Sequence, residues 1–196
     1  MKKIVTILAV FVAQVALAQG IQLGHPSYGG SGCPSGSASI TVSPANDAIT
    51  ILFDQFIAEA GNATGRRTDR KSCNLTIPVS VPNGYSVAIF QVDYRGYNLI
   101  PRGGMNRFDA EYFWAGAQGP RISRTFFGPL NDNFSVRDEL LARNLVWTPC
   151  GVSVNLRVNA SMMTQTNSNF AQSMGVVDSA DVSAGLVYHI QYRRCW

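Results

Sequence analysis

Residues 152–162 alternate between apolar and polar side chains without a break, and this pattern constrains the fold more than any other feature of the chain. The apolar positions share one face: Val152, Val154, Leu156, Val158, Ala160 and Met162. A period of two is the side-chain spacing of a β-strand that buries one face. The same period returns from Leu186 to Tyr192. We therefore expect antiparallel sheets with one face buried and the other in water.

Several further short segments have the composition of strands: 38–42, 49–57, 110–114, 122–127, 134–136 and 145–147. Glycine and proline separate these segments, as at Gly103-Gly104 and Gly119-Pro120. A single turn of helix is expected at 138–143. Many short strands with frequent turns indicate an all-β fold, and we predict an antiparallel β-sandwich of jelly-roll or Greek-key type.

Two connections follow from local signals. Pro82-Asn83-Gly84 separates two strand-like runs, which predicts a hairpin over residues 74–94. Pro78 cannot donate a ladder hydrogen bond, so the first of these strands is expected at a sheet edge. Residues 164–183 are polar and lack sustained periodicity. They predict a long, exposed loop, of the kind that is often functional.

The amino terminus has the pattern of a secretory signal peptide over residues 1–18. Lys2 and Lys3 precede an apolar run, and Ala16-Leu17-Ala18 supplies the small residues before the cleavage site. That run is shorter than the ~20 residues that span a bilayer. No second long apolar segment follows, so no membrane span is expected in the mature protein. The compact leader indicates a bacterial protein, secreted or periplasmic.

After the leader, residues 19–32 are rich in Gly, Ser and Pro, and they predict a flexible lead-in. Residues 33–196 are expected to form a single β-sandwich domain, because no repeat or internal boundary stands out. Four cysteines lie in this region: Cys33, Cys73, Cys150 and Cys195. An even number in an exported chain predicts two disulfides, with three possible connectivities.

Zinc sites use close cysteine pairs, whereas the spacings here are 40, 77 and 45 residues. If the strands that start at Gly151 and end at Arg194 are antiparallel neighbours, Cys150 pairs with Cys195 and Cys33 with Cys73. Side-chain parity argues against that version, because Cys150 shares the Val152 face and Cys195 shares the Arg193 face. The connectivity therefore stays open.

Charge and motifs exclude several functions. The formal charge of +4 falls to about +2 once Lys2 and Lys3 leave, which is too weak a balance for nucleic-acid binding. The chain has no G-x-S-x-G, H-E-x-x-H or P-loop motif. His189 has the outward parity of an ordinary strand surface residue. Asn131-Asp132-Asn133 is typical of a turn more than of a calcium loop. We expect no cofactor and no metal.

Aromatic residues give the clearest indication of a function. Five residues lie near predicted strand ends or beside glycine, and we take them as candidate ligand-binding residues: Tyr94, Arg95, Tyr97, Tyr112 and Trp114. Flat rings stack on the apolar faces of sugars, and Arg binds hydroxyl groups. The competing interpretation is that such rings fill a sandwich core. We favour the core for Trp114 and leave Tyr94 and Tyr97 evenly balanced.

These observations predict a secreted, non-catalytic interaction module whose partner is a cell-envelope component such as a glycan. One alternative is a glycan-processing hydrolase with paired carboxylates, drawn from Asp93, Asp109 and Glu111. For Asp93 we favour a same-face ion pair with Arg95 instead. Another alternative is a structural or inhibitory protein that acts through the 164–183 loop.

Several short strings also occur together in a characteristic order: Gly32-Cys33-Pro34, Arg70-Lys71-Ser72-Cys73, Val92 to Tyr97, Phe127-Gly128-Pro129, Val146 to Gly151, and Tyr192 to Cys195. In this order the chain resembles the domain-of-unknown-function 4360 family over about residues 31–195. Tyr192 stands where the family's closing motif has Trp. The resemblance implies a small secreted protein of bacteria or fungi, and it implies no activity.

Overall fold

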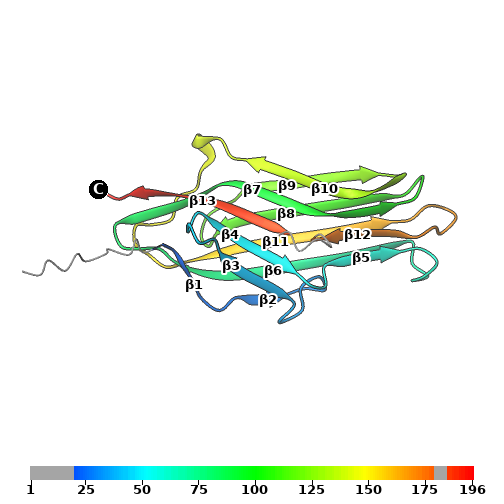
Figure 1. The fold of residues 1–196 in the computed structure, drawn as a ribbon, viewed down its shortest axis with the longest axis horizontal. Helices are drawn as coiled ribbons and strands as arrows, with labels where there is room; N and C mark the ends of the chain where they lie inside the picture. Colours follow the sequence, from blue (N-terminus) through cyan, green and yellow to red (C-terminus); the bar gives the residue numbers. More distant parts are fainter. Residues whose placement is uncertain (1–19, 179–184) are drawn as a thin grey trace, which may run out of the picture.

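The computed structural model describes residues 20–178 and 185–196, and this part of the chain forms two β-sheets packed face to face. Figure 1 shows the long strands β6 (Thr68–Ser80), β7 (Tyr85–Ile100), β8 (Met105–Trp114) and β11 (Val154–Gln165) running along the long axis of the molecule. Every described strand pairing is antiparallel. The predicted antiparallel β-sandwich is confirmed.

The first sheet has the strand order β1–β6–β11–β8–β9, and β2 also pairs with β6. Its shorter members are β1 (Gln22–Leu23), β2 (Ser27–Gly29) and β9 (Arg121–Phe127). The described part of the predicted flexible lead-in therefore forms two strands along β6, and Ile21 is only 4% exposed. Strand β6 is thus covered at its edge. Pro78 lies opposite the break between β1 and β2, where Gly24 N donates to its carbonyl oxygen.

The second sheet has the strand order β3–β4–β13–β7–β12–β5. Its shorter members are β3 (Ala38–Val42), β4 (Ala48–Phe53), β5 (Ile57–Ala60), β12 (Ser173–Val177) and β13 (Leu186–Arg194). Strands β13 and β12 pair with successive halves of β7, while β10 (Leu130–Glu139) pairs along its opposite edge. The helical turn predicted at 138–143 lies further along the chain: Asp138 and Glu139 belong to β10, and η1 covers Ala142–Asn144.

The hairpin predicted over 74–94 is wrong. Strand β6 belongs to the first sheet and β7 to the second, so residues 81–84 carry the chain from one sheet to the other. The turn is real, since Tyr85 N donates to Pro82 O. A turn signal alone does not tell a hairpin from a connection between sheets.

The long loop predicted at 164–183 is also wrong over its described part. Strand β11 continues to Gln165, and β12 forms within the segment, between β5 and β7. Thr164 and Ser173 are buried, and their hydroxyl groups are hydrogen-bonded to each other at 2.8 Å. Both residues lie in strands, Thr164 in β11 and Ser173 in β12, but their side chains are polar, which is typical of loops. Residues 179–184 lie outside the described part of the chain.

The two disulfides join Cys33 to Cys73 and Cys150 to Cys195. This is the pairing considered above, but its premise was wrong, because β11 and β13 lie in different sheets. Instead, both segments reach the start of β7. Gly151 N donates to Tyr85 O, and Cys195 N donates to Gly84 O. The objection from side-chain parity therefore does not apply, because it assumed that the two strands are neighbours in one sheet.

The core fills the space between the sheets with aliphatic and aromatic side chains. Two edge-to-face ring contacts cross it, from Tyr94 to Phe108 and from Tyr112 to Tyr188, each with centroids 5.3 Å apart. None of the described residues belongs to a helix long and apolar enough to span a membrane.

Candidate functional site

The structure separates the five predicted ligand-binding residues into two groups. Tyr94 is 0% exposed, Tyr112 2% and Trp114 4%, so these three side chains belong to the core. Burial raises the pKa of the Tyr94 and Tyr112 phenols, which keeps both neutral. Arg95 and Tyr97 are partly exposed on the outer face of the second sheet. Only these two are accessible to a ligand.

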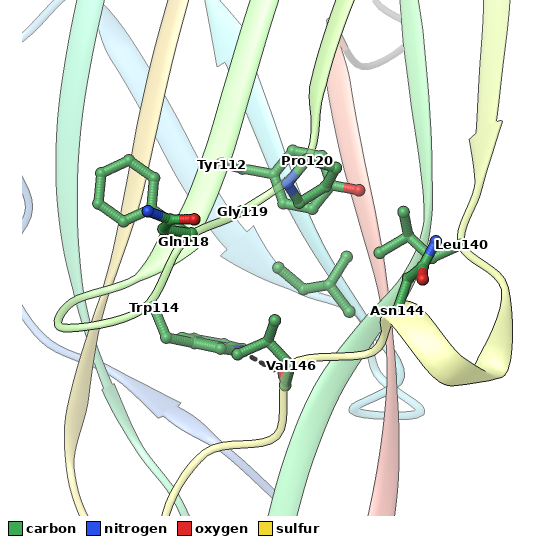
Figure 2. A pocket seen from close by; sticks show the side chains of 10 residues that line it. Tyr112, Trp114, Gln118, Gly119, Pro120, Leu140, Asn144 and Val146 are labelled. Atoms are coloured by element: carbon green, nitrogen blue, oxygen red, sulfur yellow. Dashed lines mark hydrogen bonds between the residues drawn. The ribbon is translucent and has the colours of Figure 1, made fainter.

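Tyr112 and Trp114 line a small cavity at one end of the sandwich. Figure 2 shows Tyr112 beside Pro120, with Leu140 and Asn144 across from them and Trp114 below. Trp114 Nε1 donates to Val146 O at 3.1 Å, so its polar group is already used within the protein. The cavity measures about 20 Å³, which is room for one water molecule. It is too small to be a sugar site.

A larger hollow lies beside Tyr97, and we name it the Tyr97 groove. Its volume is about 400 Å³, and it is lined by Phe53, Asp54, Phe56, Ile57, Tyr97, Asn133, Met174, Val176 and Asp178. The strand register places Ile57, Val176, Tyr97 and Asn133 in one row across β5, β12, β7 and β10. The floor of the groove is therefore mostly apolar. The carboxylates of Asp54 and Asp178 and the amide of Asn133 lie among these apolar side chains.

Tyr97 is held in position by a neighbour on β10. Its hydroxyl donates to Asn131 Oδ1, and Asn131 lies two residues before Asn133. This bond restrains the ring, and the Tyr97 side chain stays partly exposed. Asp178 is tied to the end of β4, because Phe53 N donates to its Oδ2 at 3.1 Å. The groove can thus offer a fixed ring together with hydrogen-bonding groups from three strands or turns.

A second feature of the same outer face is a buried carboxylate. Asp93 is 6% exposed and accepts hydrogen bonds from Arg137 Nε at 2.8 Å and from Gln91 Nε2 at 3.2 Å. His189 Nε2 lies 2.9 Å from its Oδ2. Burial raises the pKa of Asp93, but the hydrogen bonds from Arg137, His189 and Gln91 outweigh it and hold the pKa below its ordinary value.

The ion pair predicted between Asp93 and Arg95 is not the one that forms, because Arg137 on the neighbouring strand is Asp93's partner. Sequence reasoning missed this, since Arg137 lies 44 residues away. It also treated His189 as ordinary surface. The outward parity was right, with the side chain 30% exposed, but the contact with Asp93 depends on a strand pairing that the sequence does not show. His189 lies opposite Gln91, two residues from Asp93 on β7.

The three carboxylates of the hydrolase hypothesis do not face one another. Asp109 and Glu111 lie on the outer face of the first sheet, two residues apart on β8, whereas Asp93 is on the second sheet. Asp109 is paired with Arg107 at 3.0 Å. A glycosidase needs two carboxyl groups on either side of the scissile bond. These three residues do not provide that arrangement. Among residues 20–178 and 185–196, no cluster of three or more His, Cys, Asp or Glu side chains could hold a metal ion.

The fold and its cysteines define a secreted, disulfide-linked β-sandwich protein. The chain belongs to the family described as Domain of unknown function (DUF4360), which matches residues 19–195. The resemblance seen in the sequence is thereby confirmed. The match includes the described lead-in strands β1 and β2.

One relative is an "Uncharacterized secreted protein" of Arthroderma benhamiae, 30% identical over 170 residues, covering 86% of this chain and 69% of the relative. That relative is fungal, so the bacterial origin expected from the leader stays a prediction, as does the leader itself. The structure of TmCBM61 in complex with beta-1,4-galactotriose is similar with a TM-score of 0.33 at 10% identity, over 87% of this chain and 88% of that one. A score this low supports no inference about the ligand of this chain.

Proposed function

We propose that this secreted protein is a non-catalytic module that binds glycans of a cell envelope, and that the Tyr97 groove is its binding site. The observation that carries the proposal is the combination in one 400 Å³ hollow of a restrained tyrosine ring with Asp54, Asn133 and Asp178. Of the five residues that the sequence indicated, Tyr97 is the one that lines an open hollow of this size.

The chemistry of the groove suits a sugar ring. The apolar face of a pyranose packs on aromatic and aliphatic side chains, here Tyr97, Ile57 and Val176. Carboxylate oxygens accept hydrogen bonds from sugar hydroxyl groups, and such charge-assisted bonds are stronger than neutral ones. The Asn133 amide both donates and accepts. The volume falls within the range of small-molecule sites, ~300–1,000 Å³.

The test is binding of the mature protein to a glycan array and to purified envelope polysaccharide. The wild-type protein is expected to bind, and Tyr97→Ala is expected to lose about tenfold in affinity. A stacked ring contributes about 0.5–1.5 kcal/mol, and the upper end of this range corresponds to about tenfold. Asp54→Asn should weaken binding to a smaller extent, because the carboxylate becomes an amide of the same shape.

Phe90→Ala is the matched control, because Phe90 is an exposed ring on the same strand and does not line the groove. It should bind as the wild-type protein does. Unchanged binding by Tyr97→Ala, or an equal loss in Phe90→Ala, would remove the groove from consideration. Absence of binding to every glycan and envelope fraction would contradict the function as a whole.

A further inference from the structure

The outer face of the first sheet carries a second hollow, which we name the polar trough. Its volume is about 170 Å³, and it crosses the middle of four strands. The register aligns two rows of polar side chains across β6, β11 and β8, the first of which continues onto β9. The first row is Asn74, Asn159, Glu111 and Arg121. The second is Ser72, Ser161 and Asp109.

The surface is hollow here because the side chains of the second row are short. Two serines and one aspartate form the floor, whereas longer side chains stand around them. Arg70 borders the trough on β6, and Arg121 borders it on β9. These strands are three inter-strand spacings apart, which is about 14 Å. The two guanidinium groups therefore stand on opposite sides of a floor that is wide enough for an extended polymer.

Existing hydrogen bonds preorganise part of this surface. Arg70 Nη2 donates to Ser161 Oγ at 3.0 Å, and Arg107 is paired with Asp109 at 3.0 Å. Asn159 Nδ2 lies 3.5 Å from Glu111 Oε2. Arg121 has no hydrogen bond or ion pair with any side chain in the described part of the chain. It is an exposed cation beside an ordered polar floor.

The charge of this face is positive. On β6, β11, β8 and β9, the charged side chains with outward parity are four exposed arginines (Arg70, Arg107, Arg121 and Arg157) and two partly covered carboxylates (Asp109 and Glu111), a formal excess of two positive charges. Guanidinium groups bind carboxylates with two parallel hydrogen bonds. The Asn and Ser side chains between them can donate to or accept from hydroxyl groups. Carboxylates and hydroxyl groups together are the functional groups of a uronic acid polymer.

We propose that the polar trough is a second binding site, which takes an acidic polysaccharide. The carboxylates of the polysaccharide bind Arg121 and Arg70. Its hydroxyl groups form hydrogen bonds with the Asn and Ser side chains of the two rows. This site is independent of the Tyr97 groove, because the two lie on the outer faces of different sheets. Binding at the trough therefore requires no contribution from Tyr97.

The experiment measures binding of polygalacturonate to the mature protein by titration calorimetry at low ionic strength. Fully methyl-esterified polygalacturonate is the matched ligand, since it keeps the chain and loses the charge. We expect the acidic form to bind and the ester to fail. Arg121→Gln should weaken binding about tenfold, the loss of one bidentate pair. Arg70→Gln should act in the same direction. Because both arginines are exposed, each variant should fold, as a thermal melt verifies.

Arg194→Gln is the control for net charge, because Arg194 is an exposed arginine on the second sheet. It should bind the acidic polymer as the wild-type protein does. The proposal is overturned by equal binding of acid and ester, by an Arg121→Gln variant that binds normally, or by an equal loss in Arg194→Gln. Failure of the wild-type protein to bind polygalacturonate overturns it as well.

Discussion

His189 on β13 and Asp93 on β7 meet with 2.9 Å between Nε2 and Oδ2, although 96 residues separate them in the sequence. Arg137 from β10 completes the contact on the other side of the carboxylate. One buried acid thus connects three adjacent strands of the second sheet, between the Tyr97 groove and the chain end. The contact is structural in our interpretation, and it leads to two measurable expectations.

The first concerns stability at neutral pH. Asp93→Asn keeps the shape of the side chain and removes its charge, so the hydrogen bonds from Arg137 and Gln91 lose their ionic part. We expect the free energy of unfolding to fall by about 1 kcal/mol, as urea denaturation at pH 7 would measure. Glu139→Gln is the control, because Glu139 is exposed on the same β10 and its carboxylate attracts Arg137 only through space, without a hydrogen bond to any described residue. An equal loss in both variants would contradict a specific role for Asp93.

The second concerns the pH dependence of that difference. The pKa of Asp93 is lowered in the folded protein from 3.8, so the folded state holds its proton less tightly than the unfolded state. The stabilisation is therefore fully present above about pH 5 and is lost as the pH falls through the folded pKa. The stability gap between the wild type and Asp93→Asn should be narrower at pH 3 than at pH 5. A stability difference that is larger at pH 3 than at pH 5 would show that folding raises the pKa of Asp93 and does not lower it.

A third prediction separates two tyrosines by their hydroxyl groups. The Tyr188 hydroxyl is buried with no hydrogen-bond partner in the described residues, whereas the Tyr192 hydroxyl accepts from Ile21 N and donates to Asn46 O. Tyr188→Phe should leave stability unchanged or raise it by up to about 1 kcal/mol, since an unpaired polar group leaves the core. Tyr192→Phe should lower stability by about 1 kcal/mol or more. The reverse order in thermal melts would refute the assignment.

A fourth prediction concerns the two disulfides, which close loops of similar length, with separations of 40 and 45 residues. Chain entropy gives each about 4 kcal/mol. Cys33 and Cys73 are fully buried, so replacing both with Ala also leaves a cavity. We expect that variant to lose more stability than the Cys150→Ala, Cys195→Ala double variant. A non-reducing peptide map supplies the check on connectivity, and any crossed pair would contradict the structure.

The sequence predicted those parts of the fold that depend on local pattern. The alternation at 152–162 became β11, because a period of two reports directly that one face is buried. Strand β12 was not predicted, because Ser173 and Gly175 interrupt its apolar pattern although both residues are buried. The hairpin failed for a different reason, because sheet membership depends on partners far away in the sequence.

The candidate site was predictable in part. Tyr94 alternates with Val92, and that parity already indicates an inward side chain, whereas Tyr97 falls on the opposite face. Nothing local places Ile57, Asn133 and Val176 beside Tyr97, because they reach it through three different strand pairings. The polar trough could not be predicted from the sequence for the same reason. Its rows are visible only once the register across four strands is known.

The short strands β1 and β2 occupy the free edge of β6, and Ile21 beside them is sunk into the core. A product trimmed past residue 29 would leave the backbone donors and acceptors of β6 open to another molecule, which is how sheet proteins come to polymerise. The amino-terminal strands would then decide whether this protein stays dispersed or forms fibres. Recombinant versions should begin no later than Gly20.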